Sequence, residues 1–225
     1  MSELNINFGD RKIHAFDVDG TLMPGAVVEH AFNKILSDGQ IRLTDSEIER
    51  ILSCKELDNN EYIRQVVQGF SEGTKGLSIK YLRRLANEVG EKDAANIFPE
   101  MQVILDSIKD AKEDIVLISG SPRIFVEALG RRLGATVSDG THHYSARGII
   151  HQTRPRRKTI HEKDKHLRSI CRSLGGQAIS AYGDSNNDIS MLFSVPNPVA
   201  VNPLPGLKEL AMDNNWQIIE CSREN

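Results

Sequence analysis

The 225-residue chain has few cysteines, and none is spaced as in a metal cluster or a disulfide-rich domain. Cys54, Cys171 and Cys221 lie far apart and form no Cys-x-x-Cys pair. A disulfide framework and a thiolate zinc site are therefore excluded as the basis of the fold. The first residues show no basic region followed by an apolar run, and no stretch of about 20 apolar residues occurs. We expect a cytoplasmic protein without a membrane partner.

The chain also lacks an excess of positive charge. Lys and Arg number 28 against 31 for Asp and Glu, which gives a formal net charge of -3. A surface that binds nucleic acid normally needs a basic excess, so we expect no nucleic-acid partner. Hydrophobic residues make up 39% and charged residues 26%, as in a globular protein with one large core or a core and a smaller companion.

Three short apolar runs, each ended abruptly by polar residues, predict buried parallel strands. They are Ile13–Phe16, Ile115–Ser119 and Ile179–Tyr182. Helical spacing of apolar residues follows the second run, with Pro122 as the expected first helical residue, and a helix starting at Pro99 precedes that run. This alternation predicts an α/β fold with a doubly wound, mostly parallel, Rossmann-like sheet.

Between about Pro24 and Ile97 no strand pattern occurs, and apolar residues recur three and four positions apart. We therefore expect an all-helical cap of residues 24–97, inserted into a core formed by residues 1–23 and 98–225. The polar stretch 139–158 is expected to form a short hairpin and a loop. Its basic cluster 154–158 is interpreted as solvated surface, with contact to an anionic substrate as the alternative.

Acidic and small polar residues collect where the predicted strands end. These residues are Asp17, Asp19, Ser119, Gly120, Asp184 and Asp188. Ligands of open α/β sheets bind beyond the carboxyl ends of the strands, so the carboxylates should meet in one crevice. Buried together they would raise one another's pKa unless a cation neutralised them. Oxygen ligands without a His or Cys cluster favour Mg²⁺ over Zn²⁺.

Each of these residues has a structural interpretation when it is taken alone. Asp19 before Gly20 is a turn signal, Ser119 or Ser121 could cap a helix, and Asp188 could complement a helix dipole. A single lysine is most often solvated. The seven histidines lack metal-ligand spacing and are expected to be structural. Only the combination of strand-end residues favours a catalytic site.

Four ordered motifs resemble those of the haloacid dehalogenase superfamily. They are Asp17-Val-Asp-Gly-Thr-Leu22, Ser119-Gly-Ser121, Lys163 and Gly183-Asp-Ser-Asn-Asn-Asp188. The insertion after the first motif resembles the phosphoserine-phosphatase-like branch, whose helical cap occupies that place. The resemblance implies a Mg²⁺-dependent phosphatase that hydrolyses a small phosphorylated metabolite through an aspartyl-phosphate.

The resemblance also implies a role for each acidic residue. Asp17 would be the nucleophile, and Asp19 would protonate the leaving oxygen and then activate water. Asp17, the backbone carbonyl of Asp19 and Asp184 would ligate the metal. Asp188 would hold a metal-bound water or act as a weaker ligand.

Three further residues would bind the phosphoryl group, according to the same resemblance. Ser119 and the Gly120 N–H would hold its oxygens, and Lys163 would neutralise charge. Lys165 is the alternative lysine. Lys163 is preferred because the family's lysine commonly stands four residues before a leucine, here Leu167.

The substrate and the phosphoryl acceptor stay open at this stage. Phosphoserine-specific enzymes carry a glutamate nine residues after the nucleophile, where this chain has Ala26 and the nearest glutamate is Glu29. We therefore expect phosphoserine to be a poor substrate and specificity to depend on the cap, including Glu29 and Phe32. The alternatives are a phosphotransferase or mutase of the same superfamily, a receiver-like phospho-aspartate signalling module and a non-catalytic binding protein.

Overall fold

The computed structural model of the protein describes residues 11–56, 59–154 and 162–222. Within them one sheet has the strand order β4-β3-β2-β1-β5-β6-β7. Neighbouring strands are parallel except for the antiparallel pair β3 and β4, so the predicted mostly parallel α/β sheet is confirmed. The strands are β1 (Arg11–Phe16), β2 (Asp114–Pro122), β3 (Val137–Ala146), β4 (Ile149–Arg154), β5 (Gly176–Gly183), β6 (Asn197–Val201) and β7 (Gln217–Ile219).

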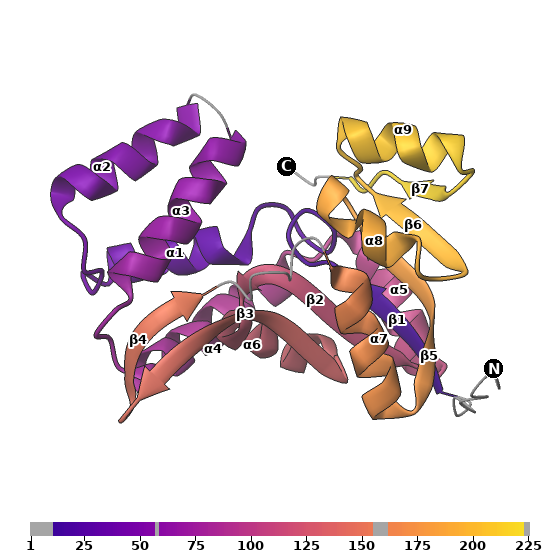
Figure 1. Ribbon diagram of the computed structural model, residues 1–225, viewed down its shortest axis with the longest axis horizontal. Helices are drawn as coiled ribbons and strands as arrows, with labels where there is room; N and C mark the ends of the chain where they lie inside the picture. The colour runs from indigo at the N-terminus through magenta and orange to yellow at the C-terminus, as the bar shows by residue number, and fades with distance from the viewer. Residues whose placement is uncertain (1–10, 57–58, 155–161, 223–225) are drawn as a thin grey trace, which may run out of the picture.

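Helices cover both faces of this sheet (Figure 1). Side chains alternate along β2, so that Ile115 and Leu117 pack on one face and Val116 and Ile118 on the other. The first face is covered by α5 (Pro99–Asp110) and α6 (Arg123–Leu133). The second is covered by α7 (Lys163–Leu174), α8 (Ile189–Leu192) and α9 (Pro205–Asp213), and the short 3₁₀ helix η2 (Asn186–Asp188) precedes α8.

The segment between β1 and α5 contains no strand among its described residues. Its helices are α1 (Val27–Ser37), α2 (Asp45–Ser53), the 3₁₀ turn η1 (Cys54–Glu56), α3 (Asn59–Gly73) and α4 (Ile79–Ala95). In Figure 1, α1, α2 and α3 stand beyond the carboxyl end of β1, whereas α4 lies along α6. Gly90 permits this contact, because a Cβ there would lie 3.0 Å from the backbone of Ala128 and Leu129.

A single hydrophobic cluster joins the inserted helices to the sheet. Buried side chains of α1 and α3 pack together with those of α4, α6 and β2. The cap boundaries at residues 24 and 97 stay a proposal, and the packing of α4 places that helix closer to the core than to α2.

The hairpin expected in residues 139–158 is present, although its first strand is also part of the main sheet. β3 pairs with β2 in parallel and with β4 in antiparallel fashion. The basic cluster beyond Arg154 lies outside the described residues, as does His161. Pro122 ends β2, and α6 begins one residue later than expected. No helix in the described ranges combines the length and the hydropathy needed to cross a bilayer.

Candidate active site

Asp17 stands directly after β1, at the carboxyl edge of the sheet. Its backbone N–H donates to the Tyr182 carbonyl at 2.9 Å, which extends the pairing of β1 with β5 by one residue. Asp17 is only 5% exposed. Its carboxylate is therefore held at a fixed position in surroundings with little water.

Lys163, the first residue of α7, reaches this carboxylate. Its Nζ lies 2.5 Å from Asp17 Oδ1 and 2.5 Å from Asp188 Oδ1, and the residue is 3% exposed. Burial would lower the pKa of Lys163, but the charges of Asp17 and Asp188 outweigh it and raise this pKa above its usual value. Lys163 is therefore a fixed cation between two carboxylates.

Lys165 lies outside this cluster. Its side chain is 64% exposed and pairs with Glu162 near the start of α7. The structure thus brings Lys163, and not Lys165, to the strand ends.

Asp184 and Asp188 come from the turn between β5 and α8. Asp188 is fully buried, and its Oδ2 accepts from Asp184 N at 3.2 Å, from Ser185 N at 3.0 Å and from Ser185 Oγ at 3.0 Å. Both of its carboxylate oxygens therefore have protein partners. The Asp184 carboxylate has fewer hydrogen bonds than that of Asp188: its Oδ1 accepts one from Thr21 Oγ1 at 3.3 Å.

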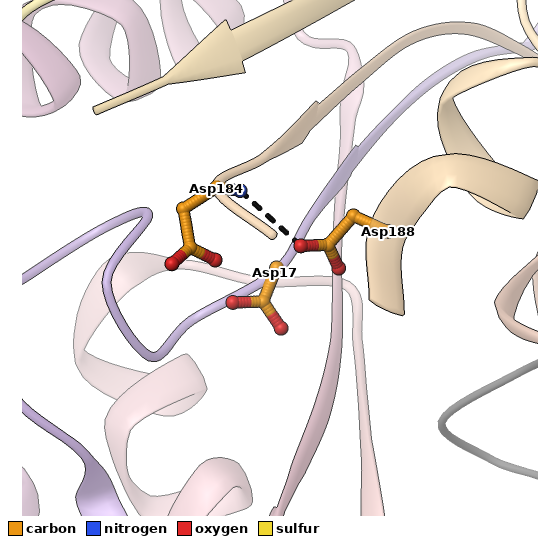
Figure 2. Close-up of side chains that lie close together, drawn as sticks. All are labelled: Asp17, Asp184 and Asp188. Carbon is orange, nitrogen blue, oxygen red and sulfur yellow. Dashed lines mark hydrogen bonds between the residues drawn. The ribbon is translucent and has the colours of Figure 1, made fainter. Parts of the chain in front are cut away.

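Three carboxylates meet here, as Figure 2 shows, with one oxygen each of Asp17, Asp184 and Asp188 within 4.8 Å of one another. Burial raises the pKa of Asp17 well above its usual value, and the other carboxylates add to this while Lys163 opposes it. Burial and the charge of Asp188 raise the pKa of Asp184 to about 7. One lysine cannot neutralise the cluster, and the oxygen donors fit a hard divalent cation such as Mg²⁺.

Asp19 points toward a different set of donors. Its Oδ2 accepts from the hydroxyls of Ser119 and Ser121, both at 2.8 Å, and its Oδ1 accepts from Val27 N at 2.7 Å. Burial nevertheless raises the pKa of Asp19, although these hydrogen bonds act in the opposite direction. A carboxyl group with a raised pKa can act as a general acid and base.

Ser121 stands in the second motif, but helix capping was the only role that the sequence analysis gave it. Its hydroxyl donates to Asp19 and accepts from Val28 N at 3.1 Å, so it links Asp19 to the first turn of α1. The period-two spacing of Ser119 and Ser121 along β2 was the signal that could have identified it. Ser121 N in turn donates to Ser119 Oγ at 2.9 Å.

The three residues named for specificity have different surroundings in the structure, although all lie at or near the start of α1. Ala26 is 7% exposed and precedes α1. Glu29 pairs with Lys55 at 2.9 Å, and Lys55 Nζ lies 5.1 Å from the ring centroid of Tyr62. Phe32 is fully buried in the hydrophobic cluster, and the expected dependence of specificity on it stays a prediction.

Replacing Lys163 by alanine is expected to lower kcat by about 100-fold to 1000-fold, the scale for a group that stabilises charge in the transition state. The exposed Lys165 provides the control, and Lys165→Ala should leave kcat within about twofold, as is usual for a surface substitution. Steady-state hydrolysis of an aryl phosphate measures both. Equal, small effects of the two substitutions would contradict the role given to Lys163.

The chain is similar to known hydrolases. A model of the haloacid dehalogenase-like hydrolases matches residues 15–192. A putative hydrolase of Mycobacterium leprae is 28% identical over 212 residues, which cover 90% of this chain and 70% of that protein. Phosphoserine phosphatase SerB1 of Mycobacterium tuberculosis is 29% identical over 215 residues, which cover 90% of this chain and 68% of the relative.

Solved structures share the fold. A protein of unknown function from Bordetella pertussis superposes with a TM-score of 0.74 at 20% identity, covering 93% of this chain and 98% of that chain. A substrate-bound phosphoserine phosphatase gives a TM-score of 0.61 at 20% identity and covers 93% of both chains. The overall fold is thus common to these proteins.

Proposed function

Because the chain belongs to the haloacid dehalogenase-like hydrolase family, we propose that it is a Mg²⁺-dependent phosphatase that hydrolyses a small phosphomonoester through an aspartyl-phosphate on Asp17. One observation carries this proposal. The buried carboxylate of Asp17 is held by Lys163 beside the carboxylates of Asp184 and Asp188. A nucleophile fixed next to a cation and to metal-ligating oxygens suits attack on a phosphoryl group.

The first step forms the covalent intermediate. Lys163 occupies Oδ1 of Asp17, which leaves Oδ2 to attack phosphorus while the bond from phosphorus to the ester oxygen breaks. Asp19 gives its proton to that oxygen, and the alcohol leaves. The Ser119 hydroxyl, which donates to Asp19 in the structure, would turn to a phosphoryl oxygen and bind it together with the Gly120 N–H, and Lys163 stabilises the charge of the transition state.

The second step releases phosphate. Asp19, now a carboxylate, removes a proton from water, and the water oxygen attacks phosphorus as the bond to Asp17 breaks. Asp17, Asp184 and the Asp19 carbonyl would hold Mg²⁺, with Asp188 adjacent. When bound, the ion supplies positive charge for the carboxylates and for the phosphoryl oxygens.

A phosphotransferase would share the first step and pass the phosphoryl group to an alcohol instead of water. Free phosphate released in the absence of any added acceptor alcohol distinguishes the two reactions. A receiver-like module accepts one phosphoryl group without turnover, and membership of a hydrolase family weighs against it. Multiple turnovers per protein molecule would exclude it.

We further propose that the inserted helices discriminate among phosphate esters. The motif residues at the strand ends reach only the metal and the phosphoryl group, which all such esters share, so selection must depend on groups that reach the leaving alcohol. The Glu29–Lys55 pair is the candidate, because Glu29 lies in the first turn of α1, and Val27 N in that turn donates to Asp19. Ala26 offers no carboxylate to the amine of phosphoserine.

In a panel of phosphorylated metabolites, phosphoserine should have one of the lowest kcat/KM values. Glu29→Gln should change the ratio of kcat/KM values between two substrates by about tenfold, the scale for one altered pocket contact. The matched control is Glu72→Gln. Glu72 is a carboxylate of α3 that likewise pairs with a lysine, Lys75, just beyond the end of that helix. Phosphoserine as the preferred substrate, or an unchanged ranking in Glu29→Gln, would overturn the specificity argument.

A further inference from the structure

Strand β3 contacts two parts of the site that are far apart in the chain. Asp139 lies opposite Ile118 of β2, and Thr141 lies opposite Pro122. These two β3 residues are 9% and 6% exposed and have the same orientation along the strand, since they are two positions apart. The Thr141 hydroxyl donates to the Gly120 carbonyl at 2.6 Å, which fixes the peptide that follows Gly120.

Asp139 reaches α7 instead. Its Oδ2 lies 3.0 Å from Nδ1 of His166, and the two side chains are 12% and 15% exposed. Its Oδ1 accepts from Gly140 N at 2.9 Å, and His142 Nε2 at 3.6 Å and an Arg123 guanidinium nitrogen at 4.0 Å also face it. The carboxylate is therefore anchored to β3 and presents one oxygen to α7.

The first turn of α7 carries charged side chains besides Lys163. The N-cap residue Glu162 makes no side-chain capping hydrogen bond. Asp164 pairs with Arg168 four residues on, and Lys165 pairs with Glu162. These two ion pairs join residues near the start of the helix.

We propose that the Asp139–His166 pair is a positioning pair that places the Nζ of Lys163 between Asp17 and Asp188. The inference deepens the proposed function, on which it rests for its kinetic readout. His166 is three residues after Lys163, so both side chains leave the same turn of α7. A small shift of that turn would move a flexible lysine out of two hydrogen bonds, and such misplacement typically costs 10-fold to about 100-fold in rate.

The test compares two substitutions of one residue. His166→Leu removes the hydrogen bond to Asp139, whereas the amide of asparagine in His166→Asn can donate from about the position of Nδ1. We expect His166→Leu to lower kcat by about 10-fold to 100-fold with little change in KM, and His166→Asn to restore most of it. Arg168→Leu is the control, because Arg168 is 64% exposed on the same helix and should leave kcat within about twofold.

The same substitution made in a Lys163→Ala protein distinguishes a positioning role of His166 from general destabilisation. If His166 acts through Lys163, His166→Leu should cause no further loss of kcat in a Lys163→Ala protein. An additive loss in that background, wild-type kcat in His166→Leu, or equal losses in the leucine and asparagine variants would each overturn the inference.

A crystal structure of each variant gives a readout that does not depend on activity. The Lys163 Nζ should leave Asp17 and Asp188 in His166→Leu and stay hydrogen-bonded to both in His166→Asn. If Lys163 Nζ keeps its position in His166→Leu, the positioning role of the Asp139–His166 pair is refuted, whatever the kinetics show. Absence of phosphate release by the wild-type protein would instead refute the proposed function, and the crystal structures would still decide the positioning claim.

Discussion

Asp17→Asn is expected to lower kcat for an aryl phosphate by about 10⁴-fold or more, as loss of one member of a catalytic unit does elsewhere. The amide cannot form the aspartyl-phosphate. It also lacks the negative charge of the carboxylate that lies 2.5 Å from Lys163 Nζ. Phosphate release under saturating substrate measures the loss.

Asp114→Asn is the matched control for Asp17→Asn. Asp114 is also a buried carboxylate with a cationic partner, since Arg11 donates to its two oxygens at 2.7 and 2.6 Å, but it begins β2 at the opposite edge of the sheet. This control should lower Tm and leave kcat within a few-fold, because no site residue contacts it. Wild-type turnover in Asp17→Asn would refute the nucleophile assignment.

Removal of divalent cations is expected to abolish turnover, and added Mg²⁺ should restore it. Burial and mutual repulsion raise the pKa values of Asp17 and Asp184, so these carboxylates need positive charge beyond that of Lys163. Full activity after dialysis against excess chelator would contradict the metal requirement.

Two alanine substitutions distinguish the ligands. Asp184→Ala should raise the Mg²⁺ concentration needed for half-maximal activity by 10-fold to about 100-fold, whereas Asp188→Ala should mainly lower kcat. The reason is that Asp188 already gives both oxygens to Lys163 and to the Asp184–Ser185 turn, while Asp184 accepts one long hydrogen bond from Thr21. The reverse order would exchange the two roles.

Local sequence patterns predicted the elements with strong signals. The apolar runs that became β1, β2 and β5 stop at polar residues, and α5 starts at Pro99 as expected. β6 and β7 were not predicted. β6 is only five residues long and includes Pro198, and β7 has three residues, so neither has a clear period.

In the site, too, local motifs predicted some residues, whereas a contact between distant segments of the chain was not predicted. The motif spacing indicated Asp17, Asp184 and Lys163, which the fold brings together. The Asp139–His166 contact joins residues 27 positions apart, and no periodic pattern relates them. The apolar spacing predicted helices around Phe32, but its burial depends on packing against α3.

Trapping the covalent intermediate tests the central claim most directly. The protein would be mixed with a substrate that it turns over, quenched in acid within the first turnovers and treated with borohydride, which reduces an aspartyl-phosphate to homoserine. Peptide mass spectrometry should then find homoserine at position 17, and Asp17→Asn should give none. Rapid turnover without modification of Asp17, or homoserine at Asp19, Asp184 or Asp188 instead, would contradict the account.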